Sequence, residues 1–102
     1  MLDSAKTICQ YIVNKRASDL EHDRLLLGGI IRELLVIGEA ANAVSAHTRA
    51  NIPEIPWKMI IGMRNQLVHG YFDISYKIVW STITEDLPQL IAALEETFRT
   101  IR

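Results

Sequence analysis

Apolar residues recur every three or four positions from residue 76 to the end of the chain. This spacing puts them on one side of an α-helix, whereas the side chains of a strand alternate between two faces. No stretch of the sequence alternates apolar and polar residues with a period of two. The stripe therefore predicts an all-α protein. Its members are Tyr76, Trp80, Ile83, Leu87, Leu90 or Ile91, Leu94, Phe98 and Ile101.

Pro88 lies inside this stripe. Proline has no backbone N–H, and its ring clashes with the carbonyl four residues earlier. The helix must therefore either kink at Pro88 or begin again there, with Glu85 or Asp86 near the cap. Asp73 or Ser75 is the expected cap at its beginning.

Two segments in the first half of the chain show the same helical spacing. The first covers residues 2–13, with Asp3 or Ser4 as its expected cap. The second begins between residues 18 and 23, where a Ser-x-x-Glu sequence has the form of a capping box. It continues to about Ala46, so we expect one long helix there.

Prolines mark the segment that follows. Pro53 and Pro56 identify residues 48–56 as a loop. Pro56 also suits the first turn of a third helix, which should reach about His69. The expected core residues of this helix are Trp57, Ile60, Ile61, Leu67 and Val68, with Met63 as a further member.

The long second helix contains Gly28, Gly29 and Gly38. A glycine inside a helix costs about 1 kcal/mol relative to alanine, so we expect another helix to approach closely there. Val36 and Ala40 widen the apolar surface beyond one stripe, which favours burial of two faces. We therefore predict a single domain over residues 1–102, an up-and-down bundle of four to five helices that dimerises.

Composition limits the location and the partners. No apolar run is long enough to span a bilayer, the amino terminus lacks signal-peptide features, and the single Cys9 cannot form an internal disulfide. We therefore expect a cytoplasmic protein without a membrane partner. The formal net charge is −1, so binding of nucleic acid would need local cations. The cations considered are Lys15, Arg16, Lys58 and Arg64.

One stretch, residues 64–71, groups an arginine, a histidine and a tyrosine. On a continuous helix Arg64 and His69 are separated by about 140° and ~7.5 Å, so a tight pair within one helix is not guaranteed. A helix that ends near Gly70 would place His69 at the negative end of the helix dipole, which favours imidazolium. Arginine can then hold a phosphodiester while histidine moves a proton. With RNA the 2′-hydroxyl can attack, and no metal is required.

Structural roles explain the same residues equally well at this point. An arginine and a histidine on one helix are more often surface or packing residues than catalysts. Tyr71 would then be a half-buried aromatic residue. Asn65 is either a plain surface amide or a group that orients phosphate or histidine.

Other candidates for chemistry are weaker. His22 and His47 fit no metal-ligand pattern, so we expect no metal. Glu33 and Glu39 do not face each other at helical spacing, which argues against a carboxylate dyad. The Gly28-Gly29 pair lacks the pattern of a phosphate-binding loop.

The stretch resembles the Arg-x-x-x-x-His-x-Tyr signature of HepT-like proteins, a branch of the HEPN superfamily of small α-helical domains. Arg64, His69 and Tyr71 match it, and Asn65 matches the polar residue that is frequent after the arginine. The likeness continues through most of the chain, although the first predicted helix is short for the family. The further matching segments are Ile37–Ala41, Pro53–Trp57, Ile78–Trp80 and Asp86–Pro88.

The resemblance implies a metal-independent endoribonuclease toxin of a type II/VII-like toxin–antitoxin pair, with no cofactor. In such proteins the motifs of two subunits meet at a homodimer interface. Arg64 and His69 would be catalytic and Asn65 would position the RNA phosphate. The implied partner is a minimal nucleotidyltransferase antitoxin, which transfers AMP from ATP to Tyr71 and silences the toxin.

Two alternatives from other functional classes stay open. The first is a non-catalytic nucleotide- or partner-binding module of the same fold. The second is a structural dimerisation bundle in which His69 and Tyr71 only pack.

Overall fold

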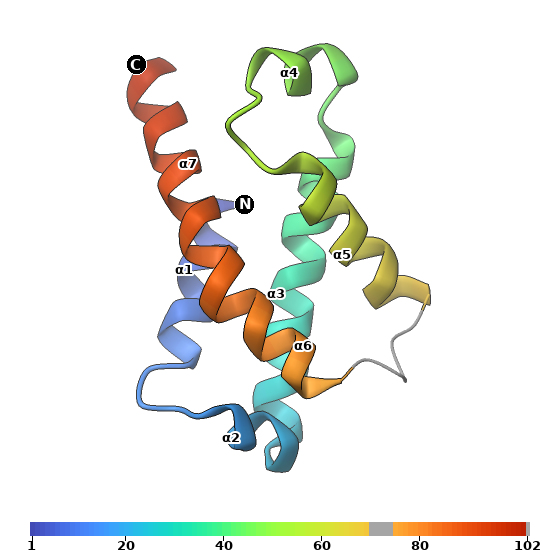
Figure 1. Cartoon of the computed structure of the whole chain (residues 1–102), viewed down its shortest axis with the longest axis vertical. Coiled ribbons are helices and arrows are strands. Elements are labelled where there is room, and N and C mark those ends of the chain that lie inside the picture. The colour runs from blue at the N-terminus through green and yellow to red at the C-terminus, as the bar shows by residue number, and fades with distance from the viewer. Residues whose placement is uncertain (70–74, 102) are drawn as a thin grey trace.

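Helix α3 (Arg24–Ala43) is the element against which α1, α2 and α5 pack in this computed structural model (Figure 1). The structure describes residues 1–69 and 75–101, without the side chains of residues 100 and 101. All regular secondary structure in these ranges is helical, so the prediction of an all-α protein is confirmed. The other elements are α1 (Leu2–Tyr11), α2 (Ala17–His22), α4 (Ala46–Asn51), α5 (Trp57–His69), α6 (Tyr76–Ser81), the π-helix η2 (Thr82–Asp86) and α7 (Leu87–Ile101).

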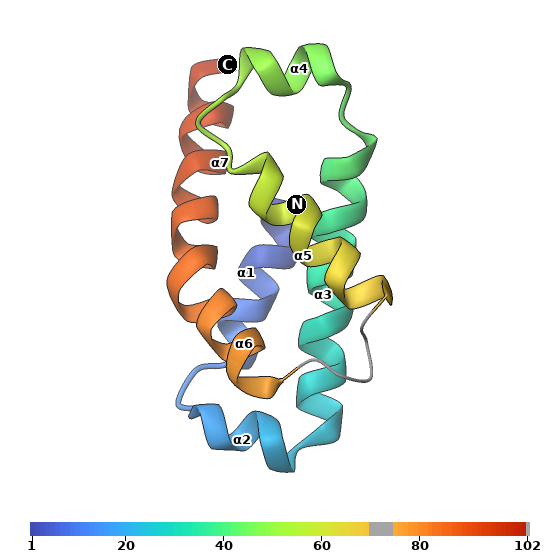
Figure 2. The ribbon, with the colours of Figure 1, turned by 45° about the vertical axis from the view of Figure 1, so that its right-hand side comes forward.

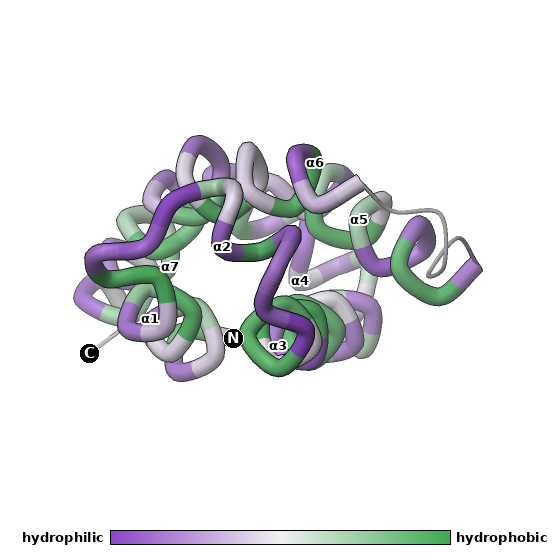
Figure 3. The backbone as a smooth tube through the Cα atoms, turned by 90° about the horizontal axis from the view of Figure 1, so that it is seen from below, coloured by the Kyte–Doolittle hydropathy of each residue, from purple (hydrophilic) through white to green (hydrophobic). Residues whose placement is uncertain are grey.

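The helices form a flattened body whose Cα atoms extend over 41 × 29 × 17 Å. Helix α1 packs against both α3 and α7, while α5 lies on the other side of α3 (Figures 2 and 3). Helix α2 contacts α3 and α6 at one end, and α4 lies at the opposite end. This arrangement leaves one long side of α5 uncovered by the described helices.

The core collects the apolar stripes of α1, α3 and the C-terminal helices. Ile8, Ile30 and Val79 are completely buried, and each such side chain stabilises the fold by about 1.5–3 kcal/mol through the hydrophobic effect. Four residues of the predicted last stripe are buried, whereas Phe98 is 47% exposed. The buried four are Ile83, Leu87, Leu90 and Leu94.

The predicted second helix, which begins between residues 18 and 23 and continues to about Ala46, corresponds to α3, which has Asp23 as its cap and ends at Ala43; the separate short helix α2 before it was not predicted. Asp23 has an extended backbone, and its Oδ1 accepts a hydrogen bond from the backbone N–H of Leu26 at 3.0 Å. This cap separates α2 from α3. The predicted Ser-x-x-Glu box does not begin α2, because Arg16 is the cap, two residues before Ser18, and the carboxylate of Asp19 accepts from the backbone N–H of Arg16 at 2.7 Å.

Two predicted boundaries in the first half also differ. Helix α1 begins at Leu2, so Asp3 and Ser4 lie inside its first turn and not at its cap. Part of the predicted loop 48–56 is helical, because the hydroxyl of Ser45 accepts from the backbone N–H of Thr48 at 3.1 Å and begins α4. The third predicted helix is confirmed as α5, although Val68 is 47% exposed and not a core residue.

A wide helical turn, the π-helix η2, lets the chain stay helical up to Pro88 although this proline cannot donate a backbone hydrogen bond. The N–H of Leu87 bonds to the carbonyl of Thr82, five residues earlier, and this π-turn stands directly before the proline. The hydroxyl of Ser75 caps α6 by accepting from the N–H of Lys77 at 3.1 Å. The alternative cap, Asp73, lies outside the described residues. No helix in the described ranges is long and apolar enough to cross a membrane.

Candidate active site

Helices α3 and α5 meet closely at Gly38 and Arg64. A Cβ atom added to Gly38 would overlap the Cβ of Arg64 and lie 2.7 Å from its Cγ, closer than real Cβ atoms come. Only glycine fits at this contact, which confirms the expected close approach of another helix at Gly38. A Cβ added to Gly29 would lie at an ordinary 3.4 Å from the ring of Tyr11, whereas a Cβ added to Gly28 would meet no described neighbour within 4 Å, so the expectation is wrong for Gly28.

The guanidinium of Arg64 is held at two points. Its Nε donates to Oε1 of Glu39 at 2.7 Å, and its Nη1 donates to Oδ1 of Asn65 at 2.9 Å. Nη2 forms no hydrogen bond within residues 1–69 and 75–101. The Arg64 side chain is 24% exposed, so this nitrogen is presented at the surface on an oriented group that can bind an anion.

Glu39 is the partner of Arg64 that sequence reasoning missed. Its spacing from Glu33 argued against a dyad, and its partner is instead the arginine of the motif. A signal was present, because Glu39 directly follows the glycine at which close helix packing was expected. A carboxylate that follows such a glycine is close to the helix that packs against the glycine.

His69 is the last residue of α5 and is exposed. Its position in the last turn puts it near the negative end of the helix dipole, as expected. The described residues show no hydrogen bond or ion pair between His69 and Arg64. The structure thus brings Arg64, Asn65 and Glu39 together and leaves His69 apart, while Gly70 and Tyr71 lie outside the described residues.

The uncovered side of α5 carries a row of exposed residues that we call the outer face. Viewed along the helix axis, every member lies within about 60° of the direction of Gly62. None of them is apolar with a large side chain, and α5 contains no acidic residue. The outer face consists of Lys58, Gly62, Asn65, Gln66 and His69.

Gly62 was not singled out by the sequence. It lies in mid-helix, where glycine costs about 1 kcal/mol relative to alanine. An added Cβ would meet no described atom within 4 Å, in contrast to Gly38 on the other side of the α3–α5 contact. Of the remaining predicted cations, Lys15 and Arg16 lie in the connection between α1 and α2, away from α5.

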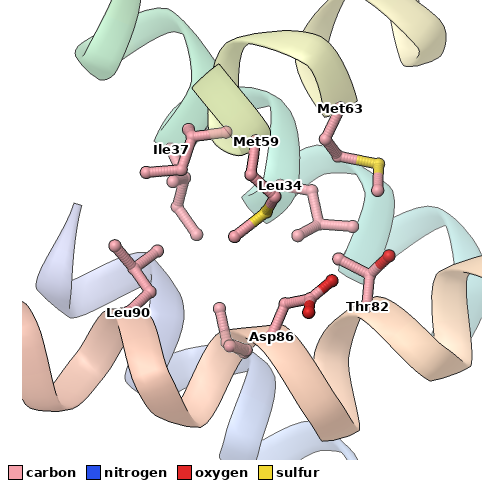
Figure 4. Close-up of a pocket in the computed structure, with 9 residues that line it drawn as sticks. Leu34, Ile37, Met59, Met63, Thr82, Asp86 and Leu90 are labelled. Carbon is pink, nitrogen blue, oxygen red and sulfur yellow. The ribbon is translucent and has the colours of Figure 1, made fainter. Parts of the chain in front are cut away.

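A cavity of about 20 Å³ lies on another side of α5, between this helix, α3 and η2–α7 (Figure 4). Asp86 points into it, and Met59 and Met63 border it from α5. The cavity holds about one water molecule and is too small for a nucleotide. Among the described residues, no group of three or more His, Cys, Asp or Glu side chains could hold a metal ion.

Comparison with known proteins gives consistent matches. A family model described as "Ribonuclease HepT-like" matches residues 1–97. A protein of Methanocaldococcus jannaschii named "Putative RNase" is 30% identical over 95 residues, which cover 93% of this chain and 87% of that protein. No solved structure gives a significant match.

Two further relatives carry similar names. A "Putative RNase" of Caldanaerobacter subterraneus subsp. tengcongensis is 33% identical over 92 residues, with 86% of this chain and 82% of the relative covered. A "Probable ribonuclease HepT" of Thermococcus cleftensis is 37% identical over 67 residues, with 66% and 61% covered.

Proposed function

Because the chain belongs to the HepT-like ribonuclease family, we propose that it is a metal-independent endoribonuclease that acts as the toxin of a type II/VII-like toxin–antitoxin pair. The observation that carries the proposal is the oriented guanidinium of Arg64. Glu39 and Asn65 hold two of its nitrogens and leave Nη2 for a phosphate. This arginine lies on the helix that ends with an exposed histidine.

The proposed reaction uses the RNA's own 2′-hydroxyl. Arg64 binds a non-bridging phosphate oxygen and stabilises the charge that develops in the transition state, an effect worth about 10²–10³ in rate. The bond from O2′ to phosphorus forms and the bond from phosphorus to O5′ breaks. His69 moves the proton from the attacking hydroxyl toward the leaving oxygen, worth about 10²–10⁴. The products are a 2′,3′-cyclic phosphate and a 5′-hydroxyl.

A homodimer supplies what a single chain lacks. Arg64 and His69 point about 140° apart on α5, which supports a site assembled from two subunits. Val36 and Val68 are 44% and 47% exposed. Val36 lies on the same side of α3 as Glu39, and Val68 on the same side of α5 as Arg64. These valines offer an apolar patch around the ion pair for the second copy.

Tyr71 is the proposed site of regulation. Its phenolic oxygen would attack the α-phosphorus of ATP in the active site of a minimal nucleotidyltransferase antitoxin, and pyrophosphate would leave. The attached AMP would occupy the anion site of Arg64 and silence the toxin. The support is the match of Tyr71 to the family signature. Incubation with the nucleotidyltransferase and ATP should add the mass of AMP to wild type and not to Tyr71→Phe.

A substrate with one altered sugar tests the reaction. An RNA and the same RNA with a single 2′-deoxynucleotide before the main cleavage site are incubated with the protein in excess chelator. Cleavage of the first with a cyclic phosphate end, and no cleavage at the altered position, is expected. Cleavage at the deoxynucleotide would contradict the proposed nucleophile.

The second candidate function is a non-catalytic nucleotide- or partner-binding module. The net charge of −1 favours it, because weak attraction to RNA is no disadvantage for such a module. Pure protein that cuts no RNA but binds ATP or a nucleotidyltransferase would establish this function. A structural dimerisation bundle would bind neither.

A further inference from the structure

Gly62 has no explanation within the described molecule. It stands five residues after the beginning of α5 and seven before its end, and its φ is not positive. An added Cβ would meet no described atom within 4 Å. Neither the backbone conformation nor packing within the described residues therefore requires glycine here, although helices disfavour it.

The residues around Gly62 identify the kind of molecule that would use the free space. Lys58 is four residues before it and His69 seven residues after it, so both lie on the same side of the helix. Asn65 lies between them and holds Nη1 of Arg64 at 2.9 Å. The outer face thus has a lysine at one end and a histidine, which can carry positive charge, at the other, and it is linked through Asn65 to the oriented guanidinium.

We propose that the RNA strand runs along the outer face of α5 and lies against the helix backbone at Gly62. This inference rests on the proposed function and identifies the surface that takes its substrate. From Lys58 to His69 the helix spans ~16 Å, which matches roughly four to five nucleotides of a stacked strand at about 3.4 Å each. Arg64 leaves α5 about 160° away from Gly62 around the helix, so the strand would meet its guanidinium beside Asn65, whose Oδ1 accepts from Nη1 at 2.9 Å.

An RNA strand fits this surface better than a protein does. Protein interfaces of stable dimers are apolar at their centre, and the outer face has no apolar side chain. The exposed Val68 lies about 120° away from Gly62 around the helix. All three charged residues of α5, Lys58, Arg64 and His69, carry or can carry positive charge. A polyanion is the complementary partner.

The test measures binding of a 2′-O-methyl RNA, which cannot be cleaved through its 2′-hydroxyl, by fluorescence anisotropy. Gly62→Leu should weaken binding at least tenfold, and Gly62→Ala should weaken it severalfold. Both residues favour helix more than glycine does, so both variants are expected to fold. Gly28→Leu is the matched control, because a Cβ added to Gly28 would also meet no described neighbour within 4 Å, and this variant should bind like wild type.

A second measurement addresses charge. Replacing Lys58 by Gln should reduce the slope of log affinity against log salt by about 0.7, the value for one phosphate contact on a single strand. An unchanged slope would contradict the path along the outer face. So would unchanged binding by Gly62→Leu, or weaker binding that accompanies a changed oligomeric state in sedimentation, since the glycine would then serve a protein contact.

The outcomes separate this inference from the proposed function. A wild type that binds the RNA in a Gly62-dependent way but cleaves no natural RNA would support the binding path and contradict the nuclease. A wild type that cleaves RNA while Gly62→Leu binds and cleaves normally would support the nuclease and overturn the binding path.

Discussion

Gly38 of α3 and Arg64 of α5 approach so closely that no side chain fits on the glycine. The next residue of α3, Glu39, accepts a 2.7 Å hydrogen bond from Nε of the same arginine. Two consecutive residues of α3 thus fix the position of Arg64. Gly38 packs against its Cβ and Cγ, and Glu39 holds its guanidinium through an ion pair.

Gly38→Ala tests the contact. The added methyl group would overlap Arg64, so we expect a loss of about 1–3 kcal/mol in the free energy of unfolding and slower RNA cleavage. Gly28→Ala on the same helix is the control and should gain up to about 1 kcal/mol, because its Cβ enters open space. Chemical denaturation measures both. Equal gains in the two variants would show that α3 and α5 do not meet closely.

Glu39→Gln tests the ion pair. The Glu39 side chain is 56% exposed, so the pair should add no more than about 1 kcal/mol to stability. A guanidinium released from its position should nevertheless lower kcat between about 10- and 100-fold, with a smaller change in KM. Glu33→Gln removes the same charge from the same helix and should keep wild-type rates. A fall in stability that accounts for the loss of activity would make Glu39 merely structural.

Tyr76 links α6 to α2. A hydrogen bond to the carboxylate of Glu21 raises the pKa of the Tyr76 phenol above its ordinary value of 10.0. The folded state therefore holds this proton more tightly than the unfolded state does. The stabilisation is fully present below pH 10.0 and is lost as the pH rises through the raised pKa.

Melting temperatures measured from pH 8 to pH 12 would test this link. Wild type should be more stable than Tyr76→Phe at pH 8, and the difference should shrink above pH 10. Tyr11→Phe serves as the control for general alkaline effects. A difference that stays constant over the whole range would contradict the hydrogen bond.

Periodicity predicted the helices well because burial of one face repeats over many residues. The stripe around Ile83 and Leu94, and the course of α5, follow from it directly. Breaks that depend on one hydrogen bond were missed, such as the cap that Asp23 provides for Leu26. The spacing of the apolar residues stays helical across such a break, so periodicity does not reveal it.

The candidate site was less accessible to sequence reasoning. Arg64, Asn65 and His69 were recognised by their chemistry and by resemblance. Glu39 lies 25 residues before Arg64, and only the packing of two helices brings them together. Gly62 carries no chemical group, and only the structure shows the empty space beside it.

Mixed subunits test the shared site. If each site takes Arg64 from one subunit and His69 from the other, a dimer of Arg64→Ala with His69→Ala contains one intact and one doubly defective site. Unfolding and refolding an equal mixture should then restore about one quarter of wild-type cleavage, since half of the dimers are mixed. Each variant refolded alone should stay inactive. No recovery in the mixture would mean that both residues act within one chain.

Cleavage of RNA in excess chelator by wild type, Arg64→Ala and His69→Ala tests the proposed nuclease most directly. Glu33→Gln serves as a control for purity and folding. Wild type and the control should cleave at the same rate and leave cyclic phosphate ends, while the Arg64 and His69 variants should lose at least about 99% of the rate. Undiminished cleavage by both variants, or loss of wild-type cleavage in chelator, would contradict a metal-independent site built on Arg64 and His69.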